Sequence, residues 1–289
     1  MSTWLIEPLE YAFMRQAIAI GLSLGILGAV VGSYLILQQM GMMSGVISHA
    51  VLPGISLAFF LELNLAIGAF IAGVLSALVV IGIQKRSRIK VDAAMALTLT
   101  SFLALGVILI TKLKTNQIDL DEILFGDILG VTSADVWRSI VITGLILGLT
   151  MLFYKELEFF TFDPLGAKAA GLPVNLLYFG LICAITLTIV ASMQTVGVLL
   201  VMSLLVGPAI TAYLLVKQLW QMMLLGSTIG AVSCVAGMYG SYYFDLPSGA
   251  AIVMVIFLLF WLAFLFSPTQ GLLTEPELKS KIRNWLRLG

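Results

Sequence analysis

Long apolar runs alternate with short polar breaks along most of the chain. A helix needs roughly 20 mainly apolar residues to cross the hydrocarbon core of a bilayer. The runs near or above this length lie at residues 12–37, 40–61, 65–83, 93–111, 136–154, 175–193, 196–216, 222–244 and 250–266. The pattern therefore predicts an all-α polytopic membrane protein with about nine transmembrane helices.

Basic residues predict the orientation of these helices. Lysine and arginine crowd the break at residues 84–90 and recur at 269–289. Cytoplasmic loops carry an excess of these residues, so both segments are expected inside. With nine crossings, the N-terminus then lies outside and the C-terminus lies in the cytoplasm. We expect residues 1–268 to form a single transmembrane domain and residues 269–289 to form a basic cytoplasmic tail.

Two longer polar segments separate the runs. Residues 112–135 are acidic, enclose a short apolar piece at 123–129 and are expected outside. They are either a solvated loop or a docking face for a partner that delivers cations. Residues 155–174 are expected inside, where the prolines and glycines of 163–164 and 171–173 predict a short helix bounded by turns.

Composition agrees with a membrane protein and excludes several other classes. The chain is 61% hydrophobic and 10% charged, with a mean hydropathy of +1.10, whereas soluble domains carry roughly 25% charged residues. Zero net charge argues against nucleic acid as a partner. Cys183 and Cys234 lie inside apolar runs, where packing is favoured over a disulfide. Glu7 and Glu10 precede the first run, so no cleavable signal is expected.

His49 is the only histidine, and it lies inside the second apolar run. On a helix, Met42, Gly45 and His49 share one face. Pro53 has no backbone N–H, so it leaves the carbonyl of His49 without its helical partner. Such backbone is tolerated at membrane depth only inside protein or beside a wet cavity. Ionisable groups within spans often mark ion paths; the alternative is a satisfied polar group that joins two helices.

The neighbours of His49 favour the ion path. Ser44 and Ser48 add hydroxyl oxygens and Met42 adds a thioether, although methionines alone are more typical of packing.

Elsewhere in the chain, glycines indicate close packing between helices, and glycine-proline pairs indicate breaks within them. Glycines at 21, 25, 28 and 32 allow close helix contact. Gly207-Pro208 interrupts the seventh run, and a weak break is expected at 194–195.

Sequence motifs for enzymatic chemistry are absent. The chain has no G-x-x-x-x-G-K-[ST], so it does not bind ATP by that route. It has no H-E-x-x-H and no cysteine pair at zinc spacing. A hydrolase would have to use His49, which has no acid beside it. Because these observations argue against enzymatic chemistry, transport is the remaining function class for a membrane protein of this kind.

Several stretches together resemble one family. Residues 47–54 read Ile-Ser-His-Ala-Val-Leu-Pro-Gly, which resembles the signature of the manganese/zinc/iron permeases of ABC importers. The resemblance covers about residues 10–268. Further matches follow in the family's order at residues 101–106, 123–129, 167–174, 193–197 and 208–214.

The resemblance implies a permease subunit that moves a divalent cation across the inner (plasma) membrane by ATP-driven alternating access. Manganese is expected first, with zinc or iron as alternatives. The implied fold is that of the cofactor-type (type II) ABC importer permeases without one N-terminal helix. The implied partners are two cytoplasmic ATPases, an extracytoplasmic metal-binding protein and a second permease copy, identical or different. The chain itself would be no enzyme and would bind no cofactor other than the transported ion.

The resemblance also implies roles for particular residues. The inner segment 163–174 is similar to the element that couples the permease to its ATPase. Its residues are Asp163, Pro164, Lys168, Gly171 and Pro173.

One position departs from the family pattern. The family has an aspartate four residues before the histidine, as its presumed metal site, and this chain has Gly45. The site thereby loses a hard oxygen ligand that manganese would favour. Ser44, Ser48, Met42 or the His49 carbonyl could replace it, a different permease chain could supply the carboxylate, or the metal could pass with little coordination. Rival functions are a permease for a larger metal chelate or cofactor and a structural or regulatory subunit that transports nothing.

Overall fold

The computed structural model describes the chain except at residues 1, 114–125, 127, 129 and 268–289. Within the described part, nine helices are long and apolar enough to cross a membrane. They are α2 (Ala12–Leu37), α3 (Met43–Phe60), α4 (Leu65–Arg86), α5 (Val91–Leu113), α7 (Ser133–Leu152), α10 (Val174–Val196), α11 (Val198–Leu215), α12 (Leu219–Phe244) and α13 (Ser248–Phe266). The shorter helices are α1 (Ser2–Glu10), α8 (Tyr154–Phe162) and α9 (Pro164–Ala169).

The predicted membrane helices are confirmed, and no end differs from its expected position by more than one helical turn. The inner polar segment differs, because it forms two short helices rather than one. Asp163 separates α8 from α9 with non-helical backbone (φ −140°, ψ 82°), because the residue before a proline disfavours the helical region. Most of the acidic segment 112–135, most of the apolar piece 123–129 and the tail 269–289 lie outside the described residues.

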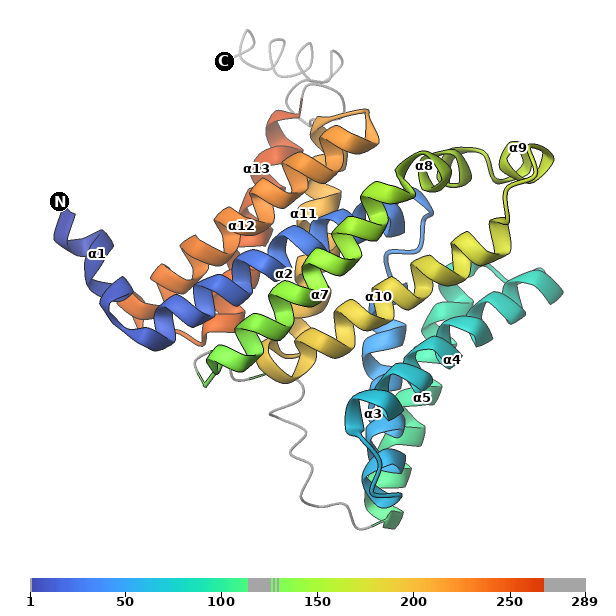
Figure 1. The fold of residues 1–289 in the computed structure, drawn as a ribbon, viewed down its shortest axis with the longest axis horizontal. Coiled ribbons are helices and arrows are strands. Elements are labelled where there is room, and N and C mark those ends of the chain that lie inside the picture. The colour runs from blue at the N-terminus through green and yellow to red at the C-terminus, as the bar shows by residue number, and fades with distance from the viewer. Residues whose placement is uncertain (1, 114–125, 127, 129, 268–289) are drawn as a thin grey trace, which may run out of the picture.

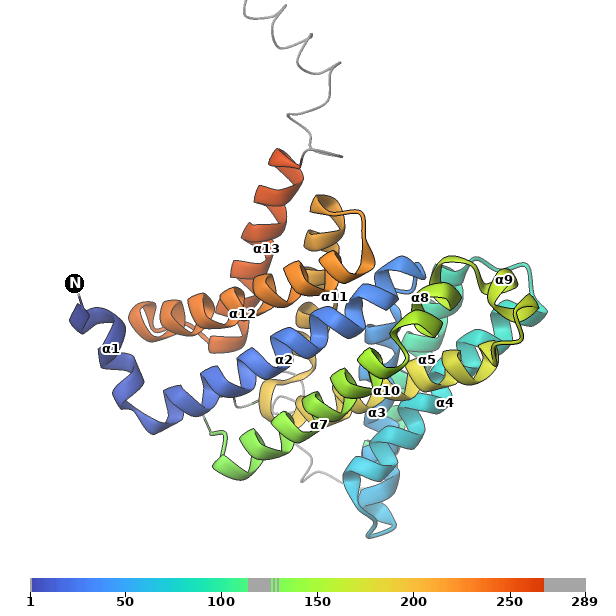
Figure 2. The ribbon, with the colours of Figure 1, turned by 45° about the horizontal axis from the view of Figure 1, so that its top comes forward.

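The helices form two groups that are visible in both views (Figures 1 and 2). In one group α3, α4 and α5 pack against each other, and in the other α2, α11, α12 and α13 do so. The α10 helix lies between them and contacts α3 and α4 on one side and α7 and α11 on the other. Because α11 also contacts α3, the α3 helix lies where the two groups meet.

Glycines on α2 allow its close approach to α11 and α12, as the sequence predicted. A Cβ on Gly25 would lie 2.8 Å from the carbonyl carbon of Gly230, and one on Gly28 would lie 2.8 Å from the carbonyl oxygen of Leu204. A Cβ on Gly32 would collide with the carbonyl oxygen of Leu205. The helix backbones touch at these positions, so any side chain would separate them.

The break between α10 and α11 lies at Gly197, slightly later than the expected break at 194–195. Gly197 has a φ of 78°, which glycine adopts readily and other residues rarely do. Gly126 also has a positive φ, and a Cβ on it would collide with the backbone nitrogen of Gly197. Gly126 therefore packs directly on this break.

Candidate functional site

The α3 helix carries the predicted site and starts from a tight turn. Gln39 in this turn has a φ of 58°, and Ser44 donates a hydrogen bond from its hydroxyl to the Gly41 carbonyl oxygen at 3.0 Å. The helix continues through Pro53. A Cβ on Gly106 would lie only 3.1 Å from Cδ of Pro53, so α5 packs closely against the proline. The predicted free carbonyl of His49 stays a prediction.

Two adjacent residues on α3 hold polar atoms that have no partner. Nδ1 of His49 and Oγ of Ser48 are buried, and neither forms a hydrogen bond with the described part of the chain. Most buried polar atoms in proteins are paired. The structure therefore gives no support to His49 as a satisfied link between helices, because Nδ1 has no partner among the described residues.

We call Met42, Gly45 and His49, which share one side at the start of α3, together with their neighbours Ser44 and Ser48, the path face of α3. The opposite side of the helix is closed by packing. A Cβ on Gly73 of α4 would lie 3.1 Å from Cγ2 of Ile47 and 2.7 Å from Cγ2 of Thr186 on α10.

The surroundings of Gly45 explain what takes the space of the expected aspartate. A Cβ on Gly45 would lie 2.9 Å from Cε of Met202 on α11 and 3.3 Å from Cδ1 of Leu99 on α5. The terminal methyl of a methionine and the end of a leucine thus fill the position where a carboxylate would begin. Met202 was missed by sequence reasoning, since nothing in the sequence indicates that α11 meets α3 at this point.

A cavity of about 700 Å³ lies beside the first turn of the path face, between α2, α5, α11 and α13. Met42 and Ser44 line it, as do Met202 and Ser203 from α11. Asp92, at the start of α5, is the one charged residue in its lining. Ser48 and His49 lie about one turn further along α3. The structure thus brings together two of the predicted residues with three that were not predicted.

The ligands near His49 are few. The described ranges contain no group of three or more histidine, cysteine, aspartate or glutamate side chains that could hold a metal ion. A cation at His49 would therefore depend on hydroxyl, thioether, carbonyl or water ligands, or on another chain. Cys183 and Cys234 are both unpaired.

The predicted coupling residues form a compact motif around α9. Asp163 caps the helix, because its Oδ1 accepts a hydrogen bond from the backbone nitrogen of Gly166 at 2.8 Å. Pro164 occupies the first turn, where its missing N–H is no loss. Lys168 lies in the last turn, where a cation suits the negative end of the helix dipole.

The end of this motif reverses the chain into α10. Gly171 has a φ of 84°, and Pro173 is the N-cap residue of α10. Leu165 on α9 is 81% exposed, so its apolar side chain is left uncovered by the rest of the chain. The motif therefore presents an exposed apolar side chain at the end of the molecule where α4 ends (Figures 1 and 2), and the last turn of α4 contains Lys85 and Arg86.

Comparison with known proteins identifies the family. Residues 10–267 match the family described as the ABC 3 transport family. The chain belongs to this family. It is 44% identical over 269 residues to the manganese transport system membrane protein MntC of Listeria monocytogenes, covering 93% of this chain and 96% of that protein. The family inferred from the sequence motifs is therefore confirmed.

Solved structures agree with this assignment. A chain of PsaBC from Streptococcus pneumoniae in complex with Fab superposes with a TM-score of 0.83 at 39% identity, covering 93% of this chain and 97% of that one. An inward-facing putative metal-chelate type ABC transporter superposes with a TM-score of 0.59 at 17% identity, covering 87% and 84%, which shows a shared fold. The protein is thus a multi-pass membrane protein with the fold of ABC importer permeases.

Proposed function

We propose that this chain is the permease subunit of an ABC importer for a divalent metal cation, with manganese first and zinc or iron as alternatives. Family membership and the manganese-transporting relative support the substrate class. The observation that carries the proposal is the buried Nδ1 of His49, which has no partner among the described residues, on the helix whose first turn lines a cavity with Met42 and Ser44. An imidazole nitrogen is a common ligand for transition metals.

The proposed path runs along α3. In the expected orientation α3 begins at the cytoplasmic end, so an incoming cation meets His49 and Ser48 before it reaches the cavity beside Met42 and Ser44. Asp92 supplies a carboxylate at that cavity, and a carboxylate is the ligand that Gly45 cannot offer. Met202 and Leu99 narrow the path beside Gly45. This constriction favours a bare cation over a larger chelate.

The proposed mechanism is alternating access between states that partner proteins stabilise in turn. The chain lacks a nucleotide-binding motif, so ATP hydrolysis would take place on cytoplasmic ATPases that dock on α9. Exposed Leu165 and Lys168 are the proposed contacts. A binding protein would deliver the metal outside, and a second permease copy would complete the assembly. Residues 1–268 form the proposed permease domain, with 269–289 as a cytoplasmic tail.

The test is metal accumulation in a host that lacks its own importers. The host would express this chain with an ATPase and a binding protein, and mass spectrometry would measure cellular manganese, zinc and iron. We expect one metal to rise, and only when the ATPase is present. A rise that requires an added chelator would favour the chelate permease instead. No rise for any metal, with all subunits present in the membrane, would contradict the proposal.

A further inference from the structure

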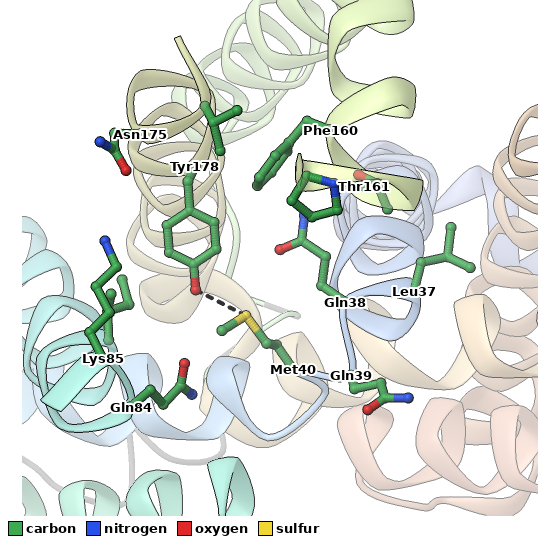
Figure 3. A pocket seen from close by; sticks show the side chains of 13 residues that line it. Leu37, Gln38, Gln39, Met40, Gln84, Lys85, Phe160, Thr161, Asn175 and Tyr178 are labelled. Carbon is green, nitrogen blue, oxygen red and sulfur yellow. Dashed lines mark hydrogen bonds between the residues drawn. The ribbon is translucent and has the colours of Figure 1, made fainter. Parts of the chain in front are cut away.

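A second cavity lies between the two helix groups, and it shares Gln39 of the α2–α3 turn with the cavity beside the path face. Its volume is about 460 Å³, which is within the range of pockets that bind small ligands. Its walls come from the turn between α2 and α3, the end of α4, the α8–α9 segment and the start of α10 (Figure 3). Four segments that are distant in the sequence therefore meet around one space.

Three hydrogen-bonding atoms at this cavity are buried and unsatisfied. Nε2 of Gln38, Nε2 of Gln84 and Oγ1 of Thr161 have no partner in the described part of the chain. Each belongs to a residue of the cavity lining. Burying a donor without an acceptor is unfavourable, and here three such donors come from three different segments. The three atoms are themselves covered, so each would meet an acceptor in the cavity once its side chain turns toward that space.

The remaining polar groups also favour an acceptor. The hydroxyl of Tyr178 donates to Sδ of Met40 at 3.2 Å, and a thioether is a weak acceptor. In Figure 3 Lys85 and Asn175 lie on one side of the Tyr178 ring, and Gln38 lies on the other. A ligand oxygen could replace the sulfur as the partner of this hydroxyl.

The charge of the cavity indicates an anion rather than a cation. Lys85 is the one charged residue in the lining, which contains no carboxylate. The carboxylates of Asp163 and Glu158 are not part of the lining, and they accept hydrogen bonds from the Gly166 nitrogen and the Tyr154 hydroxyl. The start of α10 adds the positive end of a long helix dipole to the same wall.

The position of the cavity narrows the chemistry of the ligand. It lies where α4 ends and α10 begins, beside the basic loop 84–90, which is expected in the cytoplasm. Basic pockets between transmembrane helices at this level suit phosphate-bearing headgroups. Amide, hydroxyl and ammonium donors together match the oxygens of a phosphate.

We propose that this cavity is a binding site for a phosphate group, carried either by an anionic phospholipid of the inner leaflet or by a soluble cytoplasmic phosphate compound. The occupant accepts hydrogen bonds from Gln38, Gln84 and Thr161 and is neutralised by Lys85. It thereby connects the α8–α9 segment to the ends of α2 and α4. Neither the proposed metal path nor its residues are needed for this binding.

The test measures anion binding to the assembled transporter, so it does not depend on metal transport. Native mass spectrometry would count phosphatidylglycerol and phosphatidylcholine retained by the wild type and by the double variant Gln84→Leu/Lys85→Gln. We expect retention of phosphatidylglycerol over phosphatidylcholine, and at least a tenfold loss in the double variant. If inorganic phosphate displaces the lipid or alone raises the melting temperature of the wild type, the natural source is soluble. If phosphate has neither effect, the source is the lipid.

Two controls keep the proposal falsifiable. Arg86→Gln removes the adjacent positive charge, which is not part of the cavity lining, and should retain binding. Thr161→Ser keeps the hydroxyl and should bind, whereas Thr161→Val should bind more weakly, which separates lost contacts from misfolding. Equal loss in Arg86→Gln and the double variant would show general surface attraction and overturn the proposal. So would the absence of any preference for anions in the wild type.

Discussion

Gly45 determines how much space the path face offers to a ligand. Its nearest neighbour is the terminal methyl of Met202, which can rotate away because methionine is flexible. The position therefore tolerates a side chain better than the glycines that touch backbone. This difference makes Gly45 a suitable position for testing metal selectivity without disrupting the fold.

We expect Gly45→Asp to shift selectivity toward manganese. The substitution adds a hard carboxylate oxygen on the same helix face as His49, and manganese favours such ligands more than zinc does. In the accumulation assay, the ratio of manganese to zinc should rise by about tenfold, as expected for a change in metal coordination. Gly45→Ala is the matched control, because it adds the same Cβ without the carboxylate. Identical ratios in the two variants would show that this face does not select the metal.

At the scale of elements, the α2 helix holds its neighbours by backbone contact. Gly32 meets the carbonyl of Leu205 on α11, and this contact has no side chain that could move aside. Gly82 on α4 is also inside a helix, but a Cβ there would meet nothing within 4 Å. The two glycines therefore separate the effect of packing from that of helix propensity.

We expect Gly32→Ala to destabilise the protein and Gly82→Ala to leave it unchanged or slightly more stable. The added methyl must push α2 from α11, and overpacking of this kind typically costs about 1–3 kcal/mol. Alanine at Gly82 benefits from its higher helix propensity. The melting temperatures of the two purified variants and the wild type, measured in the same detergent, report both effects on stability. Equal melting temperatures would mean that α2 and α11 are further apart than the structure shows.

At the scale of the whole molecule, the proposed contacts and the direction of the path depend on which end of the helix bundle faces the cytoplasm. The basic loop 84–90, α8–α9 and the start of α3 all lie at one end of the helices in the predicted topology. The turn at residues 61–64 lies at the other end of α3 and α4. The proposed ATPase contacts and the phosphate cavity both require the first end to be inside.

Cysteine labelling tests this orientation. In a variant without Cys183 and Cys234, we expect Leu63→Cys to react with an impermeant maleimide in intact cells, because Leu63 is 59% exposed in the outer turn. Arg88→Cys should react only after permeabilisation. The reverse pattern would invert the predicted topology, and with it the proposed direction of the path.

The sequence predicted the membrane helices well because each depends on local apolar length. It also predicted the glycine contacts of α2, since small residues at helical spacing have few other uses. The residues that surround the site could not be predicted from the sequence. Met202 and Asp92 meet the path face only because α11 and α5 pack beside α3, and the cavity lined by Gln38, Gln84 and Thr161 joins segments far apart in the chain. Such contacts depend on tertiary packing, which periodicity does not encode.

Initial uptake rates in proteoliposomes test whether His49 lies on the proposed metal path. The assembled transporter would carry wild-type chain, His49→Ala or Ser56→Ala, with the metal named by the accumulation assay. Ser56 is a control on the same helix, and its hydroxyl donates to the Leu52 carbonyl oxygen at 2.9 Å. We expect His49→Ala to lower the uptake rate about tenfold or more, as for loss of a metal ligand, and Ser56→Ala to match the wild type. Equal rates in all three at equal protein levels would contradict the claim and make His49 a structural residue.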